Sequence, residues 1–210
     1  QKKTLTQKGK FFSPQYAHNG KQIIAVEANE NLENRLVIID AETGEIAKVL
    51  PNPENHFLSF PKWGSNDQSV IFLAKHRSKI AFFQHHFNHN QTEQLTDWTA
   101  HTLGSFAVSK NTVVFSASFS GIDNIYSFEL DKPQEIRQLT SVLVGAYMPT
   151  VGNSSVVFSE FTANGHVLKT LNFSDAKNQK TTLEAPVEQG QYDIKTTKNE
   201  RPILDKIPEN

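Results

Sequence analysis

Three histidines stand close together in the segment QHHFNHN, at His85, His86 and His89. Neutral imidazole is a ligand for zinc, nickel and copper, so this segment is the first place to look for metal chemistry. Successive side chains of a strand point to opposite faces of a sheet, so His85 and His86 cannot both reach one ion within an unbroken strand. No carboxylate or fourth imidazole has a matched spacing. We therefore expect no metal site here and interpret the segment as a solvated hairpin.

The motifs of common hydrolases are absent from the sequence. It contains no G-x-S-x-G elbow, no H-E-x-x-H pair and no glycine-rich phosphate loop. Acidic residues such as Asp40 and Asp123 lie in turn-forming segments, where their side chains commonly fix the turn through hydrogen bonds to the backbone. We therefore expect no catalytic residues and no cofactor.

The chain contains a sequence repeat within which these histidine and acidic residues lie. Leucines recur along the chain at Leu5, Leu50, Leu95, Leu139 and Leu183. The differences between successive residue numbers are 45, 45, 44 and 44. Each interval contains an apolar run typical of a buried strand, at residues 23–26, 70–73, 113–116 and 156–159. Prolines precede three of the runs, at Pro14, Pro61 and Pro149, and Phe106 has the matching place in the third. Repeats of this length built only of strands are typical of β-propeller blades.

We predict an all-β fold, a β-propeller of about four four-stranded antiparallel blades. The expected blades span residues 11–50, 57–95, 103–140 and 147–183. Residues 1–10 are interpreted as the closing strand of a preceding blade, and residues 184–210, polar and containing three prolines, as an exit segment or linker. Each of the four blades has its own closing strand, the last one near residues 180–183. We therefore expect an open arc from the C-terminal part of a six-bladed ring.

The repeat also brings two histidines into equivalent loops. His56 and His101 each lie five residues before the position assigned to an innermost strand. Trp98 shares the loop of His101, and Tyr147 opens the fourth blade. Ligands of proteins collect in concave sites lined by aromatic and polar groups, and the mouth of a propeller channel is such a site. We expect His56, Trp98, His101 and Tyr147 to form a ligand-binding or partner-binding site; the alternative is that these side chains only pack the loops.

Composition excludes several classes of function. The chain has 21 Lys and Arg against 22 Asp and Glu, so its formal net charge is −1. It therefore lacks the basic field that binding to a phosphate backbone needs, and nucleic acid is not an expected partner. No apolar run is long enough to span a membrane. The absence of cysteine excludes disulfides and thiolate zinc sites.

A family resemblance follows from the repeat. The pattern P-x-[YW]-x-x-[NS]-[GD]-x-x-[IV]-[IV]-[FA], then a strand, a TG-like turn and a closing Leu-Thr, resembles the repeats of TolB-like propellers, relatives of the WD-repeat class. It is clearest in FSPQYAHNGKQIIAV and VVFSASFSGIDNIYSFEL and covers about residues 4–183. The third unit departs at Phe106, and the fourth has GNSS in place of the usual Asp-Gly turn. The resemblance implies a six-bladed ring, a periplasmic or cell-envelope location and a non-catalytic, partner-binding role.

Two functions are compatible with these observations. One is an interaction module of the cell envelope that presents its loops to a protein, peptide or glycan partner. The other is the accessory propeller of a larger hydrolase of the prolyl-oligopeptidase type, with the chemistry outside these residues. The remainder of the open reading frame would distinguish them. Exposed blade edges would in addition allow self-association.

Overall fold

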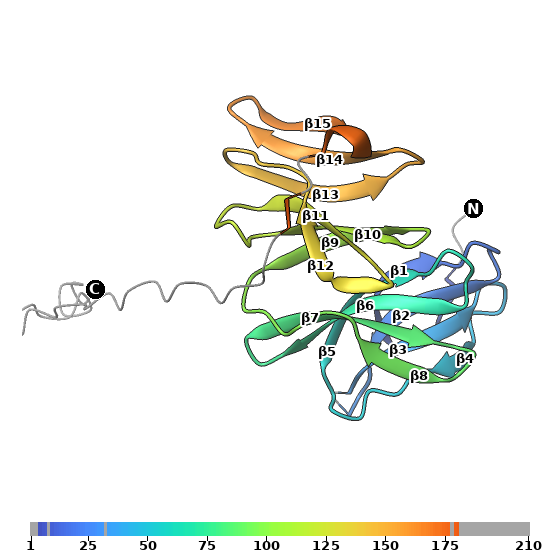
Figure 1. Ribbon diagram of the computed structural model, residues 1–210. Coiled ribbons are helices and arrows are strands. Elements are labelled where there is room, and N and C mark those ends of the chain that lie inside the picture. Colours follow the sequence, from blue (N-terminus) through green and yellow to red (C-terminus); the bar gives the residue numbers. More distant parts are fainter. Residues whose placement is uncertain (1–3, 8, 32, 177–178, 181–210) are drawn as a thin grey trace, which may run out of the picture.

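The chain folds into four antiparallel sheets that follow one another along the sequence (Figure 1). The computed structural model describes residues 4–7, 9–31, 33–176 and 179–180. The first sheet contains β1 (Lys10–Tyr16), β2 (Gln22–Ala28), β3 (Asn34–Asp40) and β4 (Ile46–Val49). The second contains β5 (Phe57–Trp63), β6 (Ser69–His76), β7 (Lys79–His86) and β8 (Gln91–Gln94).

The third sheet contains β9 (Leu103–Ser109), β10 (Thr112–Ala117), β11 (Asn124–Glu129) and β12 (Lys132–Gln138). The fourth contains β13 (Gly145–Val151), β14 (Ser155–Thr162) and β15 (Gly165–Asn172), followed by the short 3₁₀ helix η1 (Phe173–Asp175). The two-residue strand β16 (Gln179–Lys180) pairs with β12. The expected all-β propeller of about four antiparallel blades is confirmed. Within the described ranges, no helix has the length and apolarity needed to cross a membrane.

The structure corrects the prediction that residues 180–183 close the fourth blade. Residues 179–180 lie at the edge of the third sheet, where Lys180 is opposite Arg137, and the fourth sheet has three strands. The physical reason lies in η1: Phe173 packs into the apolar cluster between the third and fourth sheets, so the chain turns away from β15 instead of forming a hairpin with it. The rest of the expected strand, residues 181–183, and the exit segment 184–210 lie outside the described residues.

The first expected closing strand also differs from the prediction. Residues 4–7 form no strand in the described structure, and the preceding blade to which they were assigned stays a prediction. Leu5 packs against the face of the first sheet that points away from the second sheet, beside Ile23 and Val37. Gly44, with a positive φ of 79°, allows this contact, since a Cβ there would collide with the Leu5 carbonyl. Leu5 thus covers a face that the repeat assigns to a neighbouring blade.

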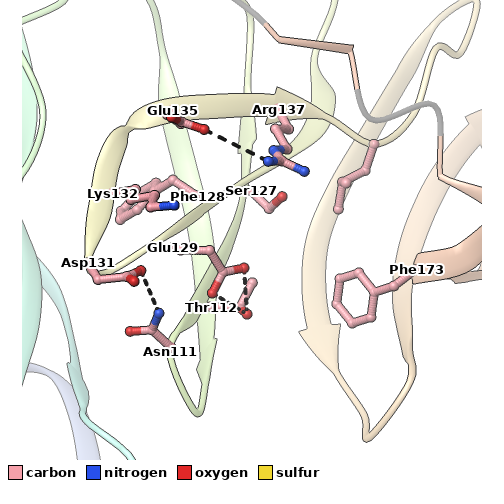
Figure 2. A pocket seen from close by; sticks show the side chains of 11 residues that line it. Asn111, Thr112, Ser127, Phe128, Glu129, Asp131, Lys132, Glu135, Arg137 and Phe173 are labelled. Carbon is pink, nitrogen blue, oxygen red and sulfur yellow. Dashed lines mark hydrogen bonds and ion pairs between the residues drawn. The ribbon is translucent and has the colours of Figure 1, made fainter.

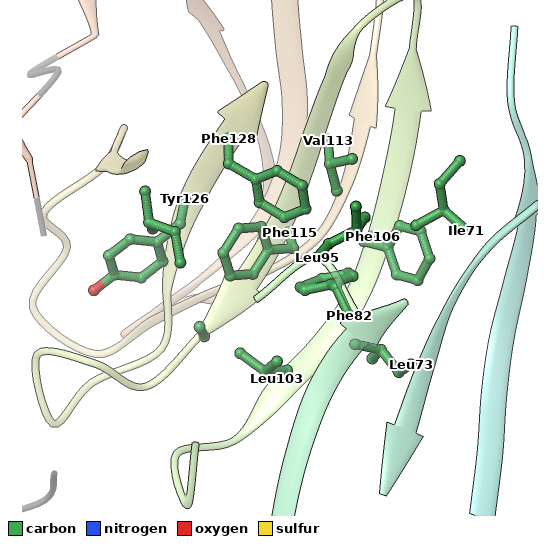
Figure 3. Close-up of a cluster of buried hydrophobic side chains, with 12 residues drawn as sticks. Ile71, Leu73, Phe82, Leu95, Leu103, Phe106, Val113, Phe115, Tyr126 and Phe128 are labelled. Atoms are coloured by element: carbon green, nitrogen blue, oxygen red, sulfur yellow. The ribbon is translucent and has the colours of Figure 1, made fainter. Parts of the chain in front are cut away.

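Successive sheets bury their faces against each other. Leu50, Leu95 and Leu139 each belong to a different one of the three clusters between adjacent sheets. In the cluster between the second and third sheets, the Phe82 ring meets Phe106, Phe115 and Phe128 edge to face, at centroid distances of 5.1, 5.1 and 5.2 Å (Figure 3). Such pairs stabilise a core beyond the area that they bury.

The hydrogen bonds of the repeated Leu-Thr pair explain why the pair recurs at a constant position in the blades. At residues 95–96, the leucine N–H donates to the Phe82 carbonyl at 2.8 Å, and the threonine Oγ1 accepts the Phe82 N–H at 3.1 Å. At residues 139–140, the same two bonds are made with Ile125, at 2.8 and 2.9 Å. The leucine therefore fills the space between sheets while the threonine satisfies a buried backbone donor.

The repeated prolines mark bulges in the innermost strands. The register of β1, β5 and β13 shifts at Pro14, Pro61 and Pro149, and the residue before each proline has a φ of 49°, 51° and 51° respectively. Proline has no N–H to donate and is therefore suited to the unpaired position of a bulge. In β9 the shift falls at residues 104–105, just before Phe106.

The four sheets form an open arc. Contacts join β1–β3 to β5, β5 to β9, and β9–β11 to β13; among the described strands, none of comparable extent joins the first sheet to the fourth (Figure 1). The outer face of the fourth sheet exposes Phe161 and Leu168, the latter to 79%. The expected open arc is confirmed.

We expect Phe82→Ala to lower the free energy of unfolding by about 3–5 kcal/mol, because it removes the ring at the centre of a packed aromatic cluster. Urea denaturation monitored by circular dichroism measures this. Phe57→Ala is the matched control, since that ring is 60% exposed, and we expect a change within about 0.5 kcal/mol. Equal losses in the two variants would contradict the assigned core.

Candidate functional site

The loop between β4 and β5 holds His56 in a fixed position. The Asn52 side chain makes two bonds to it: Oδ1 accepts the His56 N–H at 3.1 Å, and Nδ2 donates to the His56 carbonyl at 2.9 Å. Asn52 Nδ2 also donates to the carbonyl of Asn34, which joins the loop to the first sheet. The sequence of this loop, PNPENH, supplies the asparagine and two prolines that restrict its backbone.

Three aromatic rings gather around His56 at the end of the second sheet. The His56 ring meets Trp98 edge to face at 5.3 Å and His76 at 5.2 Å, and Phe83 lies 6.2 Å away. His56 Nε2 lies 3.0 Å from the Glu54 carboxylate. We call His56, His76, Phe83 and Trp98 the aromatic cluster. The structure thus brings together two of the four residues predicted for the site.

The other two predicted residues have different neighbours. His101 packs edge to face against Phe119 at 5.3 Å. Tyr147, in β13, lies 6.1 Å from the His166 ring on the fourth sheet. Partial burial, together with the charge and hydrogen bond of Asp123, raises the pKa of the Tyr147 hydroxyl above its ordinary value, so it is a neutral donor near pH 7.

His76 and Phe83 were not predicted from the sequence. His76 ends β6 and is exposed at the tip of the β6–β7 hairpin. Phe83 lies on β7 next to Phe82, and because successive side chains of a strand alternate, the two rings point to opposite sides of the sheet. An open hollow of about 460 Å³ is lined by His76 together with His56, Phe57, Lys75 and Arg77. This surface is the candidate binding site.

The histidine segment differs from its prediction. His85 and His86 do point to opposite sides, as expected for a strand: His85 is completely buried, and His86 Nε2 lies 2.8 Å from Glu93 Oε1. The expected solvated hairpin is wrong for His85, because it lies within β7 on the face that packs towards the first sheet. His89 is exposed. In the described part of the chain, no group of three or more potential ligand side chains is arranged to hold a metal ion.

A polar hollow of about 380 Å³ lies between the outer edge of the third sheet and Phe173 (Figure 2). Its polar groups bind one another: Asn111 donates to Asp131 at 2.7 Å, and Thr112 donates to Glu129 at 3.0 Å. Such mutually paired, exposed side chains are typical of an ordinary protein surface. We therefore do not place the functional site there.

Comparison with solved structures agrees with this architecture. A candidate TolB from Agrobacterium tumefaciens superimposes with a TM-score of 0.65 at 11% identity, covering 80% of this chain and 63% of that one. TolB from Acinetobacter baumannii gives 0.65 at 14% identity, with 85% and 46% covered. The chain has the TolB-like propeller fold. It spans less than two thirds of the length of either TolB structure.

A peptidase also shares this propeller fold. The acylaminoacyl peptidase of Pyrococcus horikoshii superimposes with a TM-score of 0.60 at 13% identity, over 81% of this chain and 32% of that enzyme. No protein-family model and no curated protein sequence matches the chain. At these identities the similarity establishes the fold alone.

The burial of His85 predicts a pH-dependent stability. Burial, followed by the charges of Lys48 and His86, lowers the pKa of His85 below its ordinary 6.5. The unfolded chain therefore binds this proton at a higher pH than the folded chain does, so stability decreases as the pH falls below about 6.5. Urea midpoints measured between pH 7.5 and 5 should show a smaller decrease for His85→Asn than for the unmodified protein.

The matched control for this measurement is His86→Asn. His86 neighbours His85 in sequence but lies on the other side of the strand, half-buried beside Glu93. We expect this variant to keep most of the acid-dependent loss, because burial, the largest cause of the lowered His85 pKa, is unchanged. If the His85→Asn profile is parallel to that of the unmodified protein, the imidazole is not held neutral by burial.

Proposed function

We propose that this TolB-like propeller is a non-catalytic binding module whose aromatic cluster and adjoining hollow receive a peptide segment of a protein partner. The observation that carries this proposal is the exposed Phe57 ring, 60% accessible, beside the exposed side chains of Lys75, His76 and Arg77. Exposed aromatic residues and arginine are the side chains enriched at protein interfaces.

The charges of this surface indicate the kind of partner. Lys75 and Arg77 flank the hollow, and the carboxylate of Glu54 is engaged with His56. A peptide with acidic side chains next to an aromatic or aliphatic anchor would complement these cations and pack on Phe57. His56 and Trp98 form the rigid base of the surface, because ring contacts and the Asn52 bonds fix them.

We further propose an exported, cell-envelope location, as the resemblance to TolB-like propellers implies. Glycan binding on the same aromatic surface and self-association through the exposed fourth sheet are alternative interactions that the experiment below separates from peptide binding. The hydrophobic Leu168, exposed to 79%, is the residue on which self-association would depend.

A second candidate function is the accessory propeller of a larger hydrolase. The specific observation in its favour is the peptidase of Pyrococcus horikoshii, of which this fold covers 32%. An open reading frame that continues past Asn210 into an α/β-hydrolase nucleophile elbow would favour this function over the first.

The test of peptide binding is selection from a displayed library of random twelve-residue peptides against the 210-residue chain. We expect enrichment of sequences that combine Asp or Glu with an aromatic residue. A synthesised winner should bind with a dissociation constant in the micromolar range, and Phe57→Ala or Arg77→Glu should weaken it by about tenfold, roughly 1.4 kcal/mol. Fluorescence anisotropy of the labelled peptide measures the affinity.

Phe161→Ala is the matched control, because Phe161 is also an exposed phenylalanine but lies on the fourth sheet. It should leave the affinity unchanged. Peptides that lose affinity only with Phe161→Ala or Leu168→Lys would assign binding to the fourth sheet. Failure to select any peptide, together with saturable binding of an oligosaccharide panel, would favour a glycan ligand and overturn the proposal.

A further inference from the structure

The outer edge of the fourth sheet lacks the closing strand that the first three sheets have. Within the described ranges no strand pairs with the outer side of β15, whereas β8 pairs with the corresponding side of β7. The hairpins β6–β7 and β14–β15 match, because all four strands contain eight residues. Phe82 and Leu168 are each the fourth residue of the returning strand. Leu168 therefore has the same place in the fourth sheet as Phe82 has in the second.

In the second and third sheets this place binds a Leu-Thr pair. The Leu95 N–H donates to the Phe82 carbonyl, and Thr96 Oγ1 accepts the Phe82 N–H. Ile125 makes the same two bonds in the third sheet. By register the N–H and the carbonyl of Leu168 also point to the outer edge, where an added strand can pair with them. The edge of β15 at Leu168 is therefore suited to a strand that ends in Leu-Thr.

The opposite end of the chain presents such a pair at residues 5–6. Leu5 packs against the cluster that contains Ile23 of the first sheet, just as Leu95 belongs to the cluster that contains Val113 of the third sheet. Ile23 and Val113 are the first residues of equivalent apolar runs. Leu5 thus has the position of a leucine between two sheets, although the described chain supplies only one of the two.

Tyr16 lies on the same end face of the arc. It is opposite Ile23 in the first sheet, as Trp63 is opposite Val70 in the second. The Trp63 ring is buried against the first sheet, and its Nε1 donates to the Gln15 carbonyl at 3.1 Å. Tyr16, in contrast, is 60% exposed. The two ends of the arc therefore carry the two halves of the sheet-to-sheet contact that forms three times inside it.

We infer that the outer face and edge of the fourth sheet bind the first sheet of a second copy of this chain, together with residues 4–6 of that copy. The Leu5 N–H of the second copy donates to the Leu168 carbonyl, and its Thr6 Oγ1 accepts the Leu168 N–H. A second copy fits this place because both faces continue the packing that the chain repeats internally. The contact is heterologous, since it joins the fourth sheet of one copy to the first sheet of the other.

This self-association does not depend on the proposed peptide binding. None of the residues that form the contact lines the hollow beside the aromatic cluster. The mass of the assembly is also a different readout from the affinity for a peptide, so either proposal can fail while the other holds.

The test is analytical ultracentrifugation of the 210-residue chain over a range of concentrations, in which we expect the average mass to rise with concentration. Leu168→Lys and Tyr16→Lys place a charge on the two faces and should each weaken self-association by at least about tenfold. Both side chains are exposed, so we expect unchanged circular dichroism spectra. Leu143→Lys is the matched control, because Leu143 is 92% exposed but lies in the loop between β12 and β13. It should associate like the unmodified chain.

A mixture of Leu168→Lys with Tyr16→Lys identifies which faces meet. The first variant keeps its first sheet intact and the second keeps its fourth sheet, so the two should form a 1:1 dimer although each associates weakly alone. Thr6→Val removes the acceptor for the Leu168 N–H at nearly constant shape and should weaken association by about tenfold, and Thr6→Ser should restore it.

Three outcomes would overturn the inference. The first is a chain that stays monomeric at every concentration, which would leave the edge of β15 to another occupant. The second is undiminished association of Tyr16→Lys, which would indicate that two fourth sheets pack against each other. The third is the absence of a dimer from the mixture of the two lysine variants.

Discussion

The structure depends on the burial of each sheet face by the sheet that follows it. A four-stranded sheet of this length has two apolar faces, and no helix in the described chain covers either of them. The central strands are consequently apolar on both sides, as in β6, where six successive residues are buried. The constant spacing of the leucines is a direct result, because each of Leu50, Leu95 and Leu139 must reach the same place between two sheets.

The sequence predicted the parts of the fold that this packing repeats. Strand positions, the antiparallel order and the open arc follow from periodic apolar runs, and the three prolines occupy the bulges of their inner strands. The edges were less predictable. The two-residue strand Gln179–Lys180 is too short for its sequence to predict which sheet edge it joins. The packing of Phe173 between the third and fourth sheets directs the chain to the edge of the third sheet. Leu5 kept its packing position without forming a strand, since packing needs only a face and a strand needs a partner.

The candidate site was predicted in part, for a related reason. The repeat placed His56 and Trp98 in corresponding loops, and their rings do meet. His76 and Phe83 belong to the β6–β7 hairpin. The neighbours of this hairpin depend on how the second sheet packs in the arc, and the local sequence does not predict that packing. His85 was misjudged because histidine is usually exposed, whereas here the first sheet covers it; its environment comes from residues far away in sequence, such as Leu36.

The open stacking of sheets has a consequence for the dynamics of the molecule. In a linear array, local opening is cheapest at the ends, because a terminal unit has one stabilising neighbour and an internal unit has two. Backbone amides of the three-stranded fourth sheet, with Leu168 in contact with water, should exchange with solvent sooner than those of β6 and β7. The four rings of the aromatic cluster lie on the second sheet and on the loops at its end, inside the array. The cluster should therefore keep its shape when the fourth sheet opens locally, so that binding there costs the protein little conformational freedom.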